Sequence, residues 1–180
     1  NGTVALQLAF LAAGLGPGDE GLTSPITFLA SATAMVACGA EPTFADVKEG
    51  EWTLDPTLVE SKIRSNTKVL VPVDFAGLPC DLEALREIAD RRGLTIISDS
   101  CHSIGGELGG KPVGGTGLAE MTCFSFHPVK TITTGEGGAI LTNDDELAKR
   151  LRTLRHHGVT KDPAVLEKND GPWYYELHHA

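Results

Sequence analysis

Two apolar stretches, Lys68-Val-Leu-Val-Pro-Val73 and Leu94-Thr-Ile-Ile97, are separated by the twenty residues 74–93. Continuous apolar runs of this length predict strands that are buried on both faces of a sheet. The segment between them predicts a helix over 81–92, because Asp81 is a favoured capping residue and Gly93 closes the pattern. Strand, helix and strand in this order predict a parallel sheet covered by helices on both faces, which is the α/β class.

The same alternation continues on both sides of this unit. Helices are predicted over 3–13, 28–38, 55–64 and 144–157, and strands over 21–25, 42–46, 121–126 and 139–142. The glycine-rich segment 100–117 is predicted to be a loop, and the polar segment 158–169 to be irregular. With 180 residues, the chain is long enough for one domain with a sizeable core.

The composition excludes several kinds of partner. The formal net charge is -9, from 15 basic and 24 acidic residues, and no cluster of Lys and Arg with interleaved aromatic residues is present. Nucleic-acid binding is therefore not expected. No apolar stretch reaches the roughly 18–20 residues of a membrane span, so no membrane partner is expected either.

The cysteines indicate the compartment. Their spacing includes no Cys-x-x-Cys pair, and each lies in or beside an apolar stretch: Cys38, Cys80, Cys101 and Cys123. This pattern favours reduced, partly buried thiols in a cytoplasmic protein over a zinc site or a disulfide framework. No metal site is expected.

Two residues are placed to carry chemistry. Lys130 follows a short apolar run and precedes a glycine turn, and Asp99 follows the apolar run 94–97. The carboxyl end of a buried strand is where open α/β sheets bind ligands. An amine there can form a Schiff base with an aldehyde cofactor, and a carboxylate can keep the ring of that cofactor protonated. Taken singly, each has an ordinary alternative, namely a solvated lysine and a turn aspartate.

Four further positions could bind the same kind of ligand. Asn1-Gly-Thr3 stands at a helix start, where free amides, the helix dipole and the Thr3 hydroxyl suit a phosphate, or where the segment is an ordinary helix cap. Ser125 could add a donor. Phe28 follows the break at a proline, where its ring could stack on a cofactor or pack in the core. His102 lies three residues beyond Asp99 and could bond that carboxylate, lie against the cofactor ring, or bond the backbone.

Two glycine-rich stretches resemble nucleotide-binding motifs without matching them. Gly105 and Gly110-Lys111 have the spacing of a P-loop, but Pro112 replaces the Ser or Thr that would hold magnesium. The stretch Gly135-Glu-Gly-Gly138 lacks the strand-to-helix context of a dinucleotide fingerprint. A nucleotide-sugar oxidoreductase on a Rossmann sheet, which needs such a fingerprint, is therefore disfavoured.

Taken together, the motifs resemble those of a known family. The stretches that carry the resemblance are Asn1-Gly-Thr-Val-Ala-Leu6, Pro25-Ile-Thr-Phe-Leu-Ala-Ser31, Ser98-Asp-Ser-Cys-His-Ser103, Phe124-Ser-Phe-His-Pro-Val-Lys130 and Gly135-Glu-Gly-Gly138. In this order they resemble the DegT/DnrJ/EryC1/StrS family of sugar aminotransferases, which use pyridoxal 5′-phosphate.

The resemblance implies a fold and a domain assignment. The fold would be the large domain of the fold-type I aminotransferases, with a mixed, mostly parallel sheet sandwiched by helices. Residues 1–180 would form this pyridoxal phosphate-binding domain, without the small C-terminal domain and the N-terminal segment of the family. The abrupt ends of the sequence, at Asn1 and shortly after Trp173-Tyr-Tyr175, fit that expectation.

The resemblance also implies roles for the site residues. Lys130 would carry the cofactor and move protons, and Asp99 would pair with its pyridine nitrogen, so these two are the expected catalytic residues. The residues expected to bind the cofactor are Thr3, Val4, Phe28, Asp99, His102, Ser125 and Lys130. Among them, the phosphate would be held by Thr3, Ser125 and the backbone amide of Val4.

The expected reaction is the transamination of a nucleotide-linked 4-keto-6-deoxy sugar, UDP-linked in the branch that serves pseudaminic acid biosynthesis, with L-glutamate as the amino donor. A cytoplasmic homodimer with a shared active site is implied. A 3-keto sugar aminotransferase and a sugar dehydratase of the same family are alternatives. The dehydratases have a histidine where this chain has Lys130, which favours transamination. A non-catalytic relative that binds nucleotide sugar is the further alternative.

Overall fold

A computed structural model describes residues 1–168 and 170–178 and contains one six-stranded sheet in the order β2-β1-β3-β4-β7-β8. Its strands are β1 Glu20–Thr23, β2 Glu41–Phe44, β3 Thr67–Val71, β4 Thr95–Asp99, β7 Met121–Ser125 and β8 Gly138–Leu141. Neighbouring strands are parallel from β2 to β7, and β8 runs antiparallel to β7. The predicted α/β class with a mixed, mostly parallel sheet is confirmed.

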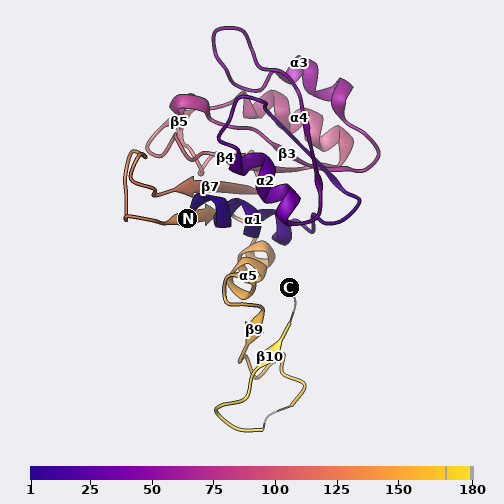
Figure 1. Ribbon diagram of the computed structural model, residues 1–180, viewed down its shortest axis with the longest axis vertical. Coiled ribbons are helices and arrows are strands. Elements are labelled where there is room, and N and C mark those ends of the chain that lie inside the picture. The colour runs from indigo at the N-terminus through magenta and orange to yellow at the C-terminus, as the bar shows by residue number, and fades with distance from the viewer. Residues whose placement is uncertain (169, 179–180) are drawn as a thin grey trace.

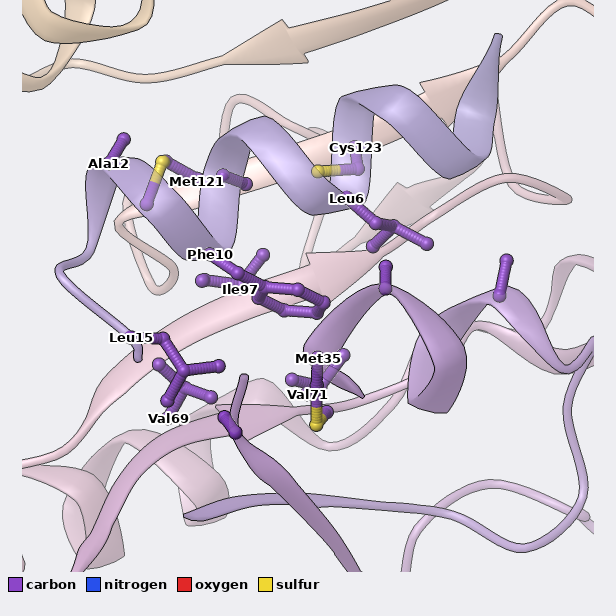
Figure 2. Packing of buried hydrophobic residues seen from close by; sticks show 14 of the residues in the cluster. Leu6, Phe10, Ala12, Leu15, Met35, Val69, Val71, Ile97, Met121 and Cys123 are labelled. Atoms are coloured by element: carbon purple, nitrogen blue, oxygen red, sulfur yellow. The ribbon is translucent and has the colours of Figure 1, made fainter. Parts of the chain in front are cut away.

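Helices cover both faces of this sheet (Figure 1). Helices α1 Gly2–Ala12, α2 Ala30–Ala37 and α5 Asp145–Arg155 pack on one face, and α3 Pro56–Val59 and α4 Leu82–Arg92 pack on the other. The strands alternate accordingly, since Ile97 of β4 joins the first core cluster and Ile96 joins the second. Figure 2 shows the first cluster, in which Phe10 of α1 lies beside Ile97.

The predicted helix over 81–92 is α4, and its ends are formed by the predicted capping residues. The Asp81 side chain accepts a hydrogen bond from the amide of Ala84, and Gly93 ends the helix in the left-handed conformation with φ of 67°. Glu83 lies in the first turn and two arginines in the last, as the helix dipole favours. Leu85 and Ile88 lie on its buried face. The strand–helix–strand prediction on which the fold depends is confirmed.

Several predicted boundaries differ from the structure. The helix predicted over 55–64 is only α3, followed by the 3₁₀ turn η1 at Glu60–Lys62, because no residue of that turn is buried. The predicted loop 100–117 contains a small hairpin of β5 Glu107–Leu108 and β6 Lys111–Pro112. A short 3₁₀ turn, η2 Phe75–Gly77, follows β3.

The segment 158–169, predicted to be irregular, also contains a strand. Strand β9 Val159–Thr160 pairs antiparallel with β10 Glu176–Leu177. The pairing partner is distant in sequence, so no local pattern announces it. Figure 1 shows this hairpin beyond α5, on the side away from the sheet. Within the described residues, no helix has the length and apolar character needed to cross a membrane.

Candidate functional site

A cavity of about 320 Å³ opens at the carboxyl ends of β4 and β7, beside the start of α1. The predicted site residues that line it are Thr3, Phe28, Asp99, His102, Ser125 and Lys130. They come from distant parts of the chain and meet because parallel strands end at one edge of the sheet. The structure therefore brings six of the seven predicted positions together.

The seventh position, Val4, is not among the residues that line this cavity. Its backbone amide donates a hydrogen bond of 2.9 Å to Oδ1 of Asn1, which caps α1. A capping side chain satisfies an amide that would otherwise be free at a helix start. In this structure, the amide expected to bind phosphate is thus already bonded within the chain.

The start of α1 nevertheless has the features of an anion site. Within the described part of the chain, the amides of Gly2 and Thr3 have no hydrogen-bond acceptor. Ser125, at the end of β7, lies directly against Gly2: a Cβ on Gly2 would lie 2.8 Å from Ser125 Cβ. Free amides, the positive end of the helix dipole and a hydroxyl group together suit a phosphate.

Asp99 ends β4 and is almost completely buried, with 5% of its surface exposed. Its Oδ2 accepts a hydrogen bond of 2.6 Å from the Ser31 hydroxyl, and its Oδ1 accepts one of 3.3 Å from the Cys101 amide. The alternative of a turn aspartate, which bonds only within its own loop, does not fit, because Ser31 belongs to α2. The carboxylate is held from two sides and lines the cavity.

Lys130 is half-buried and lies on the loop between β7 and β8. This loop is closed by hydrogen bonds from the Phe126 amide to the Gly137 carbonyl (2.9 Å) and from the Thr134 amide to the Phe126 carbonyl (3.1 Å). The Lys130 amide donates to the carbonyl of His127. Lys130 therefore lines the cavity from a hydrogen-bonded loop, and it is not a freely solvated side chain.

The surroundings of His102 favour the neutral form of its imidazole. Burial lowers the pKa of its imidazole below the ordinary value of 6.5, and the nearby positive charge of Lys130 lowers it further. The carboxylates of Asp99 and Asp74 act in the opposite direction. The ring stands edge-on to Phe75, with 6.3 Å between the ring centroids. Among the described residues, it makes no hydrogen bond to Asp99, whose partners are Ser31 and Cys101.

Phe28 lies at the rim of the cavity and is 63% exposed, so the alternative of core packing is wrong. Val129, also in the lining, is 77% exposed. Two large apolar side chains therefore stand open to solvent beside the cavity that Asp99 and Lys130 line. This arrangement suits a flat ring or a covering surface.

The cysteines are all free thiols. Burial raises the pKa of Cys80 to about 12 and also raises those of Cys38, Cys101 and Cys123, so the thiols are neutral. In residues 1–168 and 170–178, no group of His, Cys, Asp and Glu side chains is placed to hold a metal ion.

Three residues that support the site through hydrogen bonds were not predicted. Ser31 bonds Asp99, Thr27 bonds Ser31 and lines the cavity, and Asp74 bonds Ser103 in the loop that carries His102. The sequence held a signal for two of them. Asp74 closely follows an apolar strand pattern, as Asp99 does. Ser31 is a polar residue in a segment rich in alanine, where a buried helix face is expected.

The chain matches the model of the family described as the DegT/DnrJ/EryC1/StrS aminotransferase family over residues 1–171. It is 40% identical to the spore coat polysaccharide biosynthesis protein SpsC of Bacillus subtilis (strain 168), over 97% of this chain and 44% of that protein. The chain therefore spans less than half the length of this relative.

Solved structures that resemble this chain in fold and sequence include the following two. The PLP-form of the putative sugar aminotransferase Spr1654 from Streptococcus pneumoniae has a TM-score of 0.86 and 31% identity, over 98% of this chain and 47% of that one. DesI in the presence of its TDP-sugar product has a TM-score of 0.83 and 37% identity, over 88% and 39% of the two chains. With its motifs, its sheet order and these matches in agreement, the chain belongs to the DegT/DnrJ/EryC1/StrS aminotransferase family.

Proposed function

We propose that this protein is a pyridoxal 5′-phosphate-dependent aminotransferase that acts on a nucleotide-linked 4-keto-6-deoxy sugar, with L-glutamate as the amino donor. One observation carries the proposal: Lys130, Asp99 and the free amides at the start of α1 all face one cavity. An amine, a carboxylate and an anion site are the three contacts that this cofactor needs.

The residues present fit the phosphate end of the cofactor. Because Gly2 has no Cβ, the backbone of α1 comes close to the end of β7, where a Cβ would lie only 2.8 Å from Ser125 Cβ. The Gly2 and Thr3 amides and the Ser125 hydroxyl would donate to the phosphate oxygens. Thr3 and Ser125 thus keep their expected role, while the Val4 amide would first have to leave Asn1.

The residues also fit the ring end. Bound pyridoxal phosphate supplies an electron sink, because its protonated ring withdraws electrons from the carbon that carries the amino group. Asp99 would pair with the ring nitrogen and keep it protonated. Phe28 would stack on the ring, and the neutral His102 would lie beside it.

Lys130 would hold the aldehyde end covalently and, once displaced by the donor amine, move the proton that transamination transfers. A lysine performs this as a free base, and a positioned general base contributes typically about 10²–10⁴-fold to a rate. The Asp99 carboxylate would stabilise the positive charge on the ring.

The proposed substrate class follows from the relatives and from the motifs. DesI is described with a TDP-sugar product, which supports a nucleotide-linked sugar as the substrate class. SpsC is named for polysaccharide biosynthesis, which supports a role in sugar metabolism. Within this substrate class, the stretches Ser125–Gly138 and Gly171–Glu176 resemble those of the enzyme of pseudaminic acid biosynthesis, and this resemblance supports a UDP-linked substrate.

We further propose a cytoplasmic homodimer in which the partner covers the cavity. The exposed Phe28 and Val129 at its rim support a covering surface, because large apolar side chains are commonly buried at interfaces. The four free thiols support a reducing compartment.

Borohydride treatment of the full-length protein loaded with pyridoxal phosphate, followed by peptide mass spectrometry, tests the function. The added mass is expected on Lys130, and Lys130→Ala is expected to lose glutamate-dependent 2-oxoglutarate release. Lys111→Ala, an exposed lysine outside the cavity, is the matched control and is expected to behave as the wild type. Label on another lysine, or turnover that persists in Lys130→Ala, would contradict the proposal. Cofactor binding without turnover on any keto sugar would favour the non-catalytic relative.

A further inference from the structure

Ser31 connects helix α2 to the carboxylate at the floor of the cavity. Its side chain is completely buried, and its Oγ lies 2.6 Å from Oδ2 of Asp99, a residue 68 positions away in the sequence. The hydrogen bond is short, as expected when the acceptor is a carboxylate. The other donor to Asp99, the Cys101 amide, is longer at 3.3 Å. Ser31 therefore makes the stronger of the two contacts that hold this carboxylate.

The direction of the hydrogen bonds is fixed by the available protons. Ser31 has one hydroxyl proton, and an ionised carboxylate can only accept, so this proton goes to Asp99. The Thr27 hydroxyl lies 2.7 Å from Ser31 Oγ and, with the Ser31 proton on Asp99, is the donor of this contact. The same hydroxyl also lies 3.2 Å from the Phe28 carbonyl, which is the longer of its two contacts. Thr27 also lines the cavity, whereas Ser31 does not. The result is an ordered chain from Thr27 through Ser31 to Asp99.

We propose that Ser31 is a positioning residue for Asp99: its hydroxyl, oriented by Thr27, fixes the plane of the carboxylate that faces the bound cofactor. This rests on the function proposed above, because it concerns the same carboxylate and the ring nitrogen that it would pair with. Ser31 does not line the cavity, so it would act on a bound cofactor through Asp99. Without Ser31, the contacts that remain to Asp99 among the described residues come from Cys101, whose amide lies 3.3 Å from Oδ1, and the carboxylate is held less firmly.

The test compares Ser31→Ala and Thr27→Val with Thr23→Val in the full-length protein. Thr23 is a matched control because its buried hydroxyl makes a hydrogen bond of similar length, 2.8 Å to the Val71 carbonyl, away from the cavity. Circular dichroism establishes that each variant is folded. The dissociation constant for pyridoxal phosphate is measured by absorption, and the spectrum of the bound cofactor is recorded as a function of pH.

Ser31→Ala is expected to weaken cofactor binding about tenfold and to move the spectral pH profile by about one pH unit, since a hydrogen bond to a charged group is lost. Thr27→Val is expected to cause a smaller change of the same sign, and Ser31→Thr, which keeps the hydroxyl, to restore the wild-type profile. Thr23→Val is expected to leave both measurements unchanged. If Ser31→Ala does not fold, Thr27→Val decides the question, because Thr27 is only half-buried.

A wild-type spectral profile in folded Ser31→Ala, or an equal shift in Thr23→Val, would overturn the proposal. Failure of cofactor binding gives a different result, because the wild-type protein itself would then show no bound-cofactor spectrum. Failure of turnover alone is detected by the 2-oxoglutarate assay described above and leaves the spectral comparison of the variants intact.

Discussion

Gly2 and Ser125 are in such close contact that a Cβ on Gly2 would lie 2.8 Å from Ser125 Cβ and 3.0 Å from its Oγ. Gly2 begins α1, and Ser125 ends β7. The φ angle of Gly2 is not positive, so its backbone would accept any residue, and only the lack of space requires glycine. The proposed phosphate site thus depends on a contact between a helix start and a strand end.

Gly2→Ala is therefore expected to push α1 away from β7 and weaken pyridoxal phosphate binding by about tenfold or more. Overpacking of this kind costs typically about 1–3 kcal/mol. Isothermal titration of the cofactor measures the effect. Gly16→Ala is the control, since a Cβ there meets nothing within 4 Å and its φ is also not positive. Equal binding by both variants would show that the close contact is unimportant.

Ser125→Ala is expected to leave the fold intact and to weaken binding of pyridoxal 5′-phosphate by about tenfold, through loss of one hydrogen bond to a charged group. Binding of pyridoxal, which lacks the phosphate, is expected to change little. Absorption titrations with the two ligands make the comparison. Ser61→Ala, on the exposed surface, is the control. An equal loss for both ligands would place Ser125 elsewhere than at the phosphate.

Asp74 holds the loop that carries His102. Its carboxylate is 2% exposed and accepts hydrogen bonds from the hydroxyls of Ser100 (2.7 Å) and Ser103 (2.6 Å) and from the Cys80 amide (3.0 Å). Burial raises the pKa of this carboxyl above 3.8, these three hydrogen bonds lower it, and the charge of Asp99 adds to the increase.

Because the pKa of Asp74 is higher in the folded protein, the folded state binds a proton more tightly than the unfolded state. Its contribution to stability is present below pH 3.8 and is lost as pH rises through the folded value. Asp74→Asn, which does not titrate, is expected to lack this slope, which is at most about 1.4 kcal/mol per pH unit. Urea unfolding of both proteins at several acidic pH values measures the difference. An identical pH dependence would contradict the role of Asp74.

His102 is expected to titrate below 6.5 in NMR spectra of the apoprotein, because burial and Lys130 lower its pKa. Lys130→Met is expected to raise that pKa, and Asp99→Asn to lower it further. Since the unfolded chain binds the proton more tightly, the contribution of His102 to stability is lost as pH falls through this window. An unchanged pKa of His102 in both variants would show that neither the Lys130 charge nor the Asp99 charge acts on its imidazole.

Phe10→Ala is expected to destabilise the fold by about 3–5 kcal/mol, the usual cost of removing a buried aromatic ring. Phe10 is completely buried in the core cluster that joins α1 to the sheet (Figure 2). Phe44→Ala, on β2 at the edge of the sheet and 43% exposed, is the control and is expected to cost under about 1 kcal/mol. Thermal and urea unfolding compare the two.

Much of the fold could be predicted because its signals are local. The apolar runs around residues 70 and 96, the Asp81 cap and Gly93 lie within one strand–helix–strand unit, and each acts over a few residues. The pairing of β9 with β10 and the early end of α3 could not be predicted. The first depends on a partner distant in sequence, and the second on which side chains find a buried surface.

For the site, the sequence by itself determined the chemistry that is available: an amine at Lys130, a carboxylate at Asp99, a hydroxyl at Ser125 and a helix start near Thr3. It determined the fold class as well, because periodicity and capping are properties of neighbouring residues. Those residue types are enough to name a kind of cofactor.

Only the tertiary structure decided how these groups are held. Ser31 of α2 lies 2.6 Å from Asp99 at the end of β4, although the two residues are 68 positions apart in the sequence. Hydrogen bonds between residues far apart in the chain depend on distances of a few tenths of an ångström. Packing of helices on the sheet sets such distances, and the order of residues along the chain does not express them.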